Sequence, residues 1–195
     1  MPRLVQGLKN KYPHIASLLE DLRKIKAQQS RVFQAYLSYT GMNSQQGYVS
    51  LYPFGIVFVK DESFVMRSIP QVELSNEMSG YAHYYGDNIQ LRTTFADQYE
   101  ALMKTDPLTG RDPNGQYFEE RLHGRSVRWH QKRARLLMQS KILHEMVHWA
   151  RTMITFLPDP KAPDHGWKFE KAAYGKHLTQ TSLQLMHYLY VPGTQ

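Results

Sequence analysis

The sequence predicts an α+β fold in which a small β-sheet packs against an N-terminal helix and a second long helix. Two stretches, about residues 13–39 and 127–156, repeat apolar side chains every three or four positions, as amphipathic helices do. Between them lie short segments rich in Val, Ile, Phe and Tyr, a composition that favours strands. With 195 residues and 42% hydrophobic residues, the chain is expected to form a single domain over 1–195.

The first long helix is predicted from about residue 13 to residue 39, ending near Thr40 and Gly41. Its apolar positions recur at intervals near three and four, which places them on one face. They are Ile15, Leu18, Leu19, Leu22, Ile25, Val32, Phe33 and Leu37.

The middle of the chain predicts the sheet. Residues 47–69 read as two or three short strands, interrupted by turn residues at 53–55 and 61–63. A further strand is expected where Ile89, Leu91 and Thr93 alternate with polar residues after a Gly-Asp-Asn turn. A short helix over 95–103 and a surface loop over 105–116, rich in Pro, Gly and Asp, complete this region.

Three helices are predicted after that loop. The helix over 127–156 stops at a Leu-Pro-Asp-Pro string, and a shorter helix over 167–174 ends at Gly175. A final helix is expected over about 178–190.

Composition narrows the chemistry that the chain can carry. There are no cysteines, so disulfides, thiolate metal sites and thiol nucleophiles are excluded, and a metal site must use His, Asp or Glu. No apolar run approaches the roughly 20 residues that cross a bilayer, and the N-terminus lacks the pattern of a secretion signal. The net charge of +7 favours polyanionic partners, although solvated helix faces explain much of it.

The most informative string is His144-Glu145-Met146-Val147-His148, inside the predicted helix 127–156. Histidines four residues apart lie one turn above each other, so both imidazoles can reach one zinc ion at about 2.0–2.1 Å. Glu145 flanks the ion, where it can take a proton from an attacking water and pass it to the leaving amine. The usual extended form of this motif has Val or Thr where this chain has Lys141.

A catalytic zinc needs a third protein ligand and an open position. Metzincins place Gly and His three and six residues after the second histidine, but Arg151 and Ile154 stand there, so that class is excluded. The downstream candidates are Asp164, His165 and Glu170. Glu170 is preferred, because it lies in a predicted helix after a loop long enough to turn the chain back, which suits a gluzincin-type set.

Two further features are assigned to this expected site. Tyr174 shares a helix face with Glu170, so its phenol is a candidate donor to a developing oxyanion, with a half-buried core tyrosine as the alternative. The strand around Asn88 to Arg92 is the candidate edge strand for an extended substrate, and the aromatic and histidine residues at 81–85 are candidates for the other side of the cleft.

The strings HEMVHWAR (144–151) and GWKFEKAAYG (166–175) resemble the zincin metallopeptidase toxin domains at the C-terminal ends of bacterial secreted effectors, such as type VI secretion spike proteins. The resemblance implies zinc on His144, His148 and Glu170, with Glu145 as the base. It also implies an N-terminal secretion-spike module, a protein or peptide substrate, an immunity protein as partner, and action in the periplasm of a target cell. The string at 170–175 is also similar to the Asp-x-x-Tyr-Gly string of deuterolysin-like aspzincins, with Glu for Asp and one residue more.

Two other functions are compatible with the sequence. The Arg-rich segment 121–135 suits a nucleic-acid-binding module in which the His-Glu motif is incidental, although a basic entry to an active-site helix explains it equally well. Alternatively, the zinc enzyme cleaves peptidoglycan stem peptides or cross-links rather than proteins.

Overall fold

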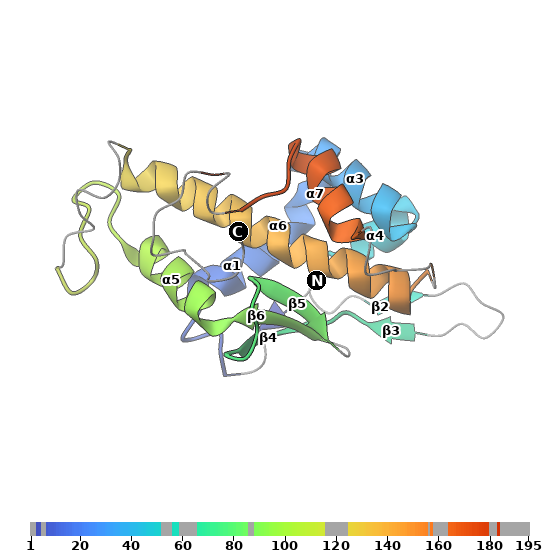
Figure 1. Ribbon diagram of the computed structural model, residues 1–195, viewed down its shortest axis with the longest axis horizontal. Helices are drawn as coiled ribbons and strands as arrows, with labels where there is room; N and C mark the ends of the chain where they lie inside the picture. Colours follow the sequence, from blue (N-terminus) through green and yellow to red (C-terminus); the bar gives the residue numbers. More distant parts are fainter. Residues whose placement is uncertain are drawn as a thin grey trace.

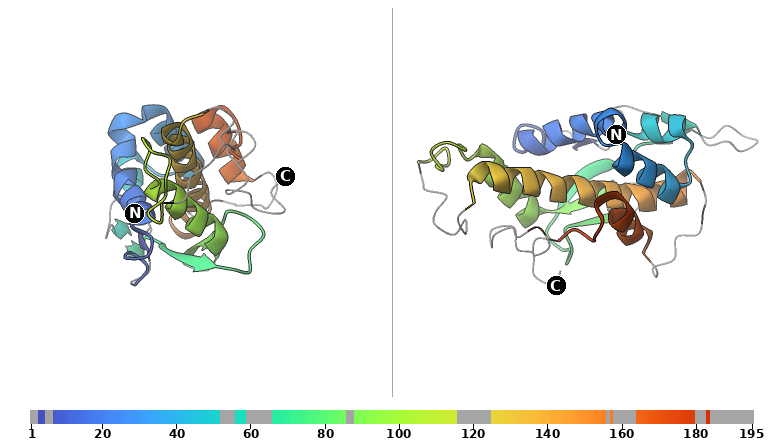
Figure 2. Two further views of the ribbon diagram at one scale, coloured as in Figure 1. Left: turned by 90° about the vertical axis from the view of Figure 1, so that its left-hand side faces the viewer. Right: turned by 90° about the horizontal axis from the view of Figure 1, so that it is seen from above.

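A long central helix organises the molecule. The computed structural model describes residues 3–4, 7–51, 56–58, 66–85, 88–115, 125–155, 157, 164–179 and 183. Helix α6 (Val127–Met153) runs through its middle, with strands on one side and helices α3 (Ser30–Thr40) and α7 (His165–Tyr174) on the other (Figure 1). The view along the long axis shows the same layers end-on (Figure 2). The predicted α+β class is confirmed.

The main sheet has four strands in the order β1-β4-β6-β5. These are β1 (Arg3–Leu4), β4 (Gln71–Ser75), β6 (Asn88–Arg92) and β5 (Ala82–Tyr85). Strand β4 pairs in parallel with β1 and β6, whereas β5 pairs antiparallel to β6. The strand predicted near 88–92 is therefore present, but the expectation that it forms the edge is wrong, because β5 covers its outer side.

The segment between the first helix and this sheet differs in part from the prediction. Strands β2 (Ile56–Phe58) and β3 (Met66–Ser68) form an antiparallel pair, as expected. Residues 44–50, however, form helix α4 (Ser44–Ser50). Asn43 caps this helix through its side-chain oxygen, and the Gln46 side chain accepts from the Asn43 backbone N–H. The Asn-x-x-Gln pattern of a capping box is visible in the sequence and outweighs the local strand preference.

The N-terminal helix is not continuous. It consists of α1 (Pro13–Asp21), a 3₁₀ turn (Leu22–Lys24), α2 (Ile25–Gln28) and then α3. Gln29, with φ −137° and ψ 61°, separates α2 from α3. The break lets α1 pack on α5 (Thr93–Lys104) while α3 packs on α7 and α6, which one straight helix could not do. The predicted end is confirmed, since Gly41 follows α3 in the left-handed conformation.

The core lies between the sheet and α6. Buried side chains of the sheet and of α5 face those of α6, among them Val72, Ile89, Leu91, Phe95, Leu137, Ile142, Leu143, Met146 and Val147. The predictions of helices at 95–103 and 127–156 are confirmed by α5 and α6. Most of the helix expected over 178–190 falls outside the described residues. Within the described part, no helix is long and apolar enough to span a membrane.

Candidate metal centre

The histidine motif lies in the most buried part of α6. The helix starts after Ser126, whose side chain accepts from the Trp129 N–H, and its second half packs against β5 on one side and α7 on the other. His144 and Glu145 are both buried. Burying two polar residues costs free energy unless their polar atoms have hydrogen-bond partners. Their burial distinguishes this motif from polar residues on an exposed helix face.

Helix α7 brings a carboxylate over the two histidines. Asp164 is the residue that precedes α7, and its Oδ1 accepts from the Trp167 N–H at 3.1 Å, as an N-cap does. The next turn of backbone passes very close to His144, since a Cβ at Gly166 would lie 2.5 Å from Cγ of that ring. Glycine at this position therefore lets the start of α7 reach the metal motif.

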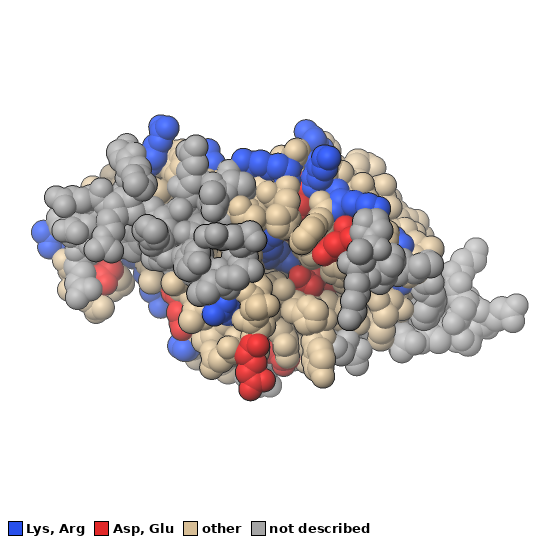
Figure 3. Space-filling model, viewed as in Figure 1, with Lys and Arg blue, Asp and Glu red and all other residues tan. Residues whose placement is uncertain are grey.

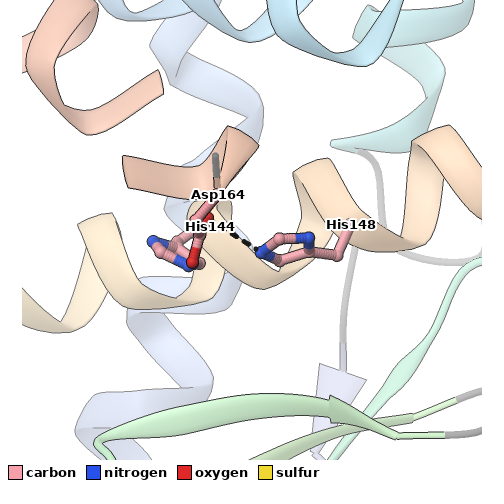
Figure 4. Close-up of side chains that lie close together, drawn as sticks. All are labelled: His144, His148 and Asp164. Carbon is pink, nitrogen blue, oxygen red and sulfur yellow. Dashed lines mark ion pairs between the residues drawn. The ribbon is translucent and has the colours of Figure 1, made fainter. Parts of the chain in front are cut away.

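His144, His148 and Asp164 converge on one point (Figure 4). Oδ1 of Asp164 lies 3.5 Å from Nε2 of His144 and 3.3 Å from Nε2 of His148. Two ligands of a tetrahedral zinc, each at about 2.05 Å, are separated by about 3.3 Å. The two separations are therefore close to the edge length of a zinc coordination tetrahedron. The donor set of two imidazoles and a carboxylate also suits zinc.

One side of this cluster faces solvent. The side chains of His148 and Asp164 are 20% and 23% exposed, whereas that of His144 is 8% exposed. A metal ion at the cluster would keep a position open toward the solvent, as catalytic sites require.

Glu170, the third ligand expected from the sequence, lies behind His144. Its Oε1 accepts from Nδ1 of His144 at 2.9 Å, on the far side of the ring from Asp164. Of the three downstream candidates, only Asp164 belongs to the cluster among the described residues; neither His165 nor Glu170 does. Sequence spacing alone could not decide which of the three residues faces the histidines. All three lie within one turn and a half of the start of α7, and the orientation of this helix is set by its packing.

Tyr174 is also placed away from the cluster. Its hydroxyl accepts from Nε2 of Gln139 at 3.4 Å, and its ring packs edge-on against Phe169. Burial raises the pKa of this phenol above its ordinary value. Tyr174 does share a helix face with Glu170, but its hydroxyl contacts Gln139 on α6 and not the His144, His148 and Asp164 cluster.

Glu145 is held by the sheet. Its Oε2 accepts from the backbone N–H of Tyr84 at 2.7 Å, and its Oε1 lies 3.9 Å from Nε2 of His144. The edge strand β5 thus fixes one carboxylate oxygen and leaves the other beside the cluster. Of the aromatic region 81–85, it is a main-chain group of Tyr84 that touches the site. A backbone contact of this kind leaves no signal in the residue types.

The ring of His144 lies between two carboxylates. Burial alone would lower its pKa, but the contacts with Asp164 and Glu170 raise the pKa of His144 to about 9. Burial would raise the carboxyl pKa values, yet the histidines hold the pKa of Asp164 well below its ordinary range. His144, His177 and Lys141 do the same for Glu170. The carboxylates of Asp164 and Glu170 therefore stay ionised on either side of His144, and Asp164 places a negative charge where a cation would bind.

Several basic side chains of α6 serve the fold. Arg135 pairs with Asp21, and Nη1 of Arg151 donates to the carbonyl oxygen of Tyr39 at 3.0 Å. Figure 3 shows other Lys and Arg side chains along the edge of the face near α7, with acidic side chains closer to its middle. These contacts give Arg135 and Arg151 structural roles that involve no nucleic-acid partner.

Comparison with known families agrees with this geometry. A family model described as metallopeptidase toxin 3 matches residues 8–175, which is most of the chain and includes every residue of the cluster. The chain belongs to the metallopeptidase toxin 3 family. It is a metallopeptidase toxin domain, as the resemblance of residues 144–175 predicts, and the family implies a metal ion and a peptidase activity. No curated protein and no solved structure matches the chain.

Proposed function

We propose that this domain is a zinc-dependent peptidase in which His144, His148 and Asp164 hold the metal and Glu145 is the general base. The observation that carries the proposal is the convergence of the three donor atoms, with separations of 3.3 and 3.5 Å that fit a tetrahedral zinc. A zinc ion in this position would supply Lewis-acid polarisation of the scissile carbonyl and of an attacking water.

The arrangement of Glu145 supports its role as the base. Because Tyr84 N–H occupies Oε2, Oε1 is the oxygen available on the side of the cluster. There it can accept a proton from the water that attacks the amide carbonyl, and then transfer that proton to the leaving nitrogen as the C–N bond breaks. The hydrogen bond from β5 limits rotation of the carboxylate, so the base is oriented before substrate binds.

Asp164 replaces Glu170 as our proposed third ligand. The carboxylate of Glu170 is committed to Nδ1 of His144 and to the backbone N–H of Leu178, whereas Oδ1 of Asp164 faces both Nε2 atoms. This assignment sets the domain apart from the gluzincin-type arrangement expected from the sequence. His165, next in the chain, remains the competing candidate and is separated from Asp164 by the experiment below.

An extended protein segment is the substrate form that the sheet supports. Strand β5 lies at the edge of the main sheet and packs against α6 beside the motif. A peptide could pair with main-chain groups of this edge other than the Tyr84 N–H, which donates to Glu145, and such hydrogen bonds depend little on sequence. We therefore move the proposed substrate strand from Asn88–Arg92 to β5.

Metal content tests the site. Purified wild-type protein and the variants His144→Ala, Asp164→Ala, His165→Ala and Glu145→Gln are analysed for zinc after dialysis, with the exposed His83→Ala as a matched control. About one zinc per chain is expected in wild type, Glu145→Gln, His83→Ala and His165→Ala, with loss in His144→Ala and Asp164→Ala. Loss in His165→Ala with retention in Asp164→Ala would exchange the two assignments. A wild type that takes up no zinc contradicts the proposal.

Activity tests the reaction. Zinc-loaded wild type is incubated with an unfolded protein such as reduced casein and, separately, with purified peptidoglycan. Cleavage of the protein, reduced by roughly 10²–10⁴-fold in Glu145→Gln without loss of zinc, is the expected result. Release of fragments from peptidoglycan alone would assign the enzyme to the cell-wall alternative.

Membership of the toxin family also supports a proposal about the biological setting. We propose a secreted effector that acts in the periplasm of a target cell and is neutralised in the producer by an immunity protein, with a secretion-spike module preceding the domain. Membership of a metallopeptidase toxin family supports an effector. Expression of wild type and Glu145→Gln in a test bacterium, with and without an added export signal, checks this. Growth inhibition by the exported wild type alone is expected, and inhibition only without export would place the target in the cytoplasm.

A further inference from the structure

Glu170 and Lys141 form a buried charged pair that the proposed mechanism does not use. The side chain of Glu170 is 0% exposed and that of Lys141 is 7% exposed, and Nζ lies 2.9 Å from Oε1. Buried ionised groups are rare unless every charge is compensated. Their presence directly behind a proposed metal ligand calls for a functional explanation.

Every side of the Glu170 carboxylate is occupied. Oε1 accepts from Nζ of Lys141 and from Nδ1 of His144, both at 2.9 Å. Oε2 accepts from the backbone N–H of Leu178 at 2.7 Å, and Nδ1 of His177 lies 2.8 Å from the same oxygen. The contacts come from α6 and from the chain after α7, so the carboxylate, itself carried by α7, is fixed in position from two sides.

This contact determines which nitrogen of His144 can bind a metal. A carboxylate can only accept, so the ring donates from Nδ1 to Glu170. Nε2, which faces His148 and Asp164, is therefore the nitrogen that would lose its proton and present its lone pair to a metal ion. The two ring nitrogens point away from each other. One ion cannot be bound by Nε2 of His144 and by a carboxylate bonded to Nδ1 of the same ring.

Lys141 explains how the acid stays ionised in this buried position. Its ammonium group compensates the carboxylate charge and lies 5.5 Å from the centre of the Tyr81 ring, an arrangement that also favours a cation. At this position, where the extended motif usually has Val or Thr, the chain places the counter-ion one turn before the first histidine.

We propose that Glu170 is a positioning residue that fixes the orientation and tautomer of His144, with Lys141 as its buried counter-ion, so that Nε2 is presented to the metal. The proposal rests on the proposed function, because it takes His144 as a metal ligand. Hydrogen-bond partners of metal-bound histidines commonly change metal affinity by 10–100-fold.

Zinc affinity in Glu170→Gln tests the proposal. Competition with a chromophoric chelator gives the dissociation constant for wild type, Glu170→Gln and Asp164→Asn. The matched control is Glu20→Gln, a glutamate on α1 whose ion pair with Lys9 is exposed. Visible spectra of the cobalt-substituted proteins report whether the metal keeps the same ligands, which distinguishes a positioning role of Glu170 from a role as a metal ligand. Thermal unfolding confirms that each variant is folded.

We expect Glu170→Gln to bind zinc roughly 10–100-fold more weakly than wild type, with an unchanged cobalt spectrum. Glu20→Gln should match wild type, and Asp164→Asn should change the spectrum. An affinity in Glu170→Gln within threefold of wild type overturns the positioning role. A changed cobalt spectrum in Glu170→Gln, together with a wild-type spectrum in Asp164→Asn, makes Glu170 a ligand and also overturns it. Absence of zinc from wild type instead overturns the proposed function, and this inference with it.

A measurement on the wild-type protein covers the case in which Glu170→Gln does not fold. In the cobalt protein, the N–H protons of the two bound imidazoles give shifted NMR signals. The proton on Nδ1 of His144 is buried and bonded to Glu170, so one of the two signals should exchange slowly with solvent. Rapid exchange of both signals contradicts the proposal.

Discussion

Replacing Gly166 with alanine should displace the ring of His144, a proposed metal ligand, while leaving the chemical identity of every proposed ligand unchanged. Gly166 is the second residue of α7, and a Cβ there would lie 2.5 Å from Cγ of His144 and would overlap the Cδ2 and Nε2 atoms. Ordinary contact begins at 3.4 Å, so the ring must retreat by at least about 0.9 Å. Zinc–ligand distances tolerate about 0.2 Å. The displacement is several times larger than this tolerance.

The expected result is a loss of zinc affinity of at least 10–100-fold, which corresponds to about 1.4–2.8 kcal/mol. The ring cannot simply rotate aside, because Glu170 holds its Nδ1. Alanine is favoured over glycine within helices by up to about 1 kcal/mol, which offsets part of the repacking cost. The fold should therefore survive while metal binding weakens.

Chelator competition measures the affinity, and thermal unfolding of the metal-free protein measures the fold. Gly80→Ala is the matched control, since the nearest atom to a Cβ there is 3.6 Å away. A folded Gly166→Ala protein that binds zinc within threefold of wild type would refute the reasoning. It would show that the start of α7 does not approach His144 as closely as the structure indicates.

Three further predictions concern the base, the fold and pH. Tyr84→Pro removes the N–H that donates to Glu145, and an edge strand tolerates proline at this position. Its kcat should fall roughly tenfold or more while its zinc content stays unchanged, which steady-state kinetics and metal analysis will test. Asn43→Ala removes the cap of α4 and should lower the free energy of unfolding by about 1 kcal/mol in urea titrations; no change would argue against the capping box. Burial raises the pKa of Glu100, which accepts from the Ile15 N–H, so its contribution to stability is present below its ordinary pKa and is lost as the pH rises through the raised value. Glu100→Gln should therefore gain stability relative to wild type as the pH rises from about 4 to 7, and a difference that does not vary with pH in urea unfolding would contradict this.

Features that depend on local spacing could be predicted from the residue types. Two histidines four residues apart on a helix must share a face, and the acid next to the first must flank them, so His144, Glu145 and His148 could be singled out without a structure. Helix α6 and strand β6 were predictable for the same reason, since periodic burial leaves its mark on residue types.

Features that depend on how separate elements pack together could not be predicted in this way. Asp164 and Glu170 are both acids near the start of the same helix, and the placement of α7 on α6 puts one at Nε2 and the other at Nδ1 of His144. The contact between Tyr84 and Glu145 is made by a backbone N–H, which every residue except proline possesses, so residue identity could not reveal it. Local periodicity thus identified the helix that carries the candidate metal site, whereas long-range packing placed the carboxylates around it.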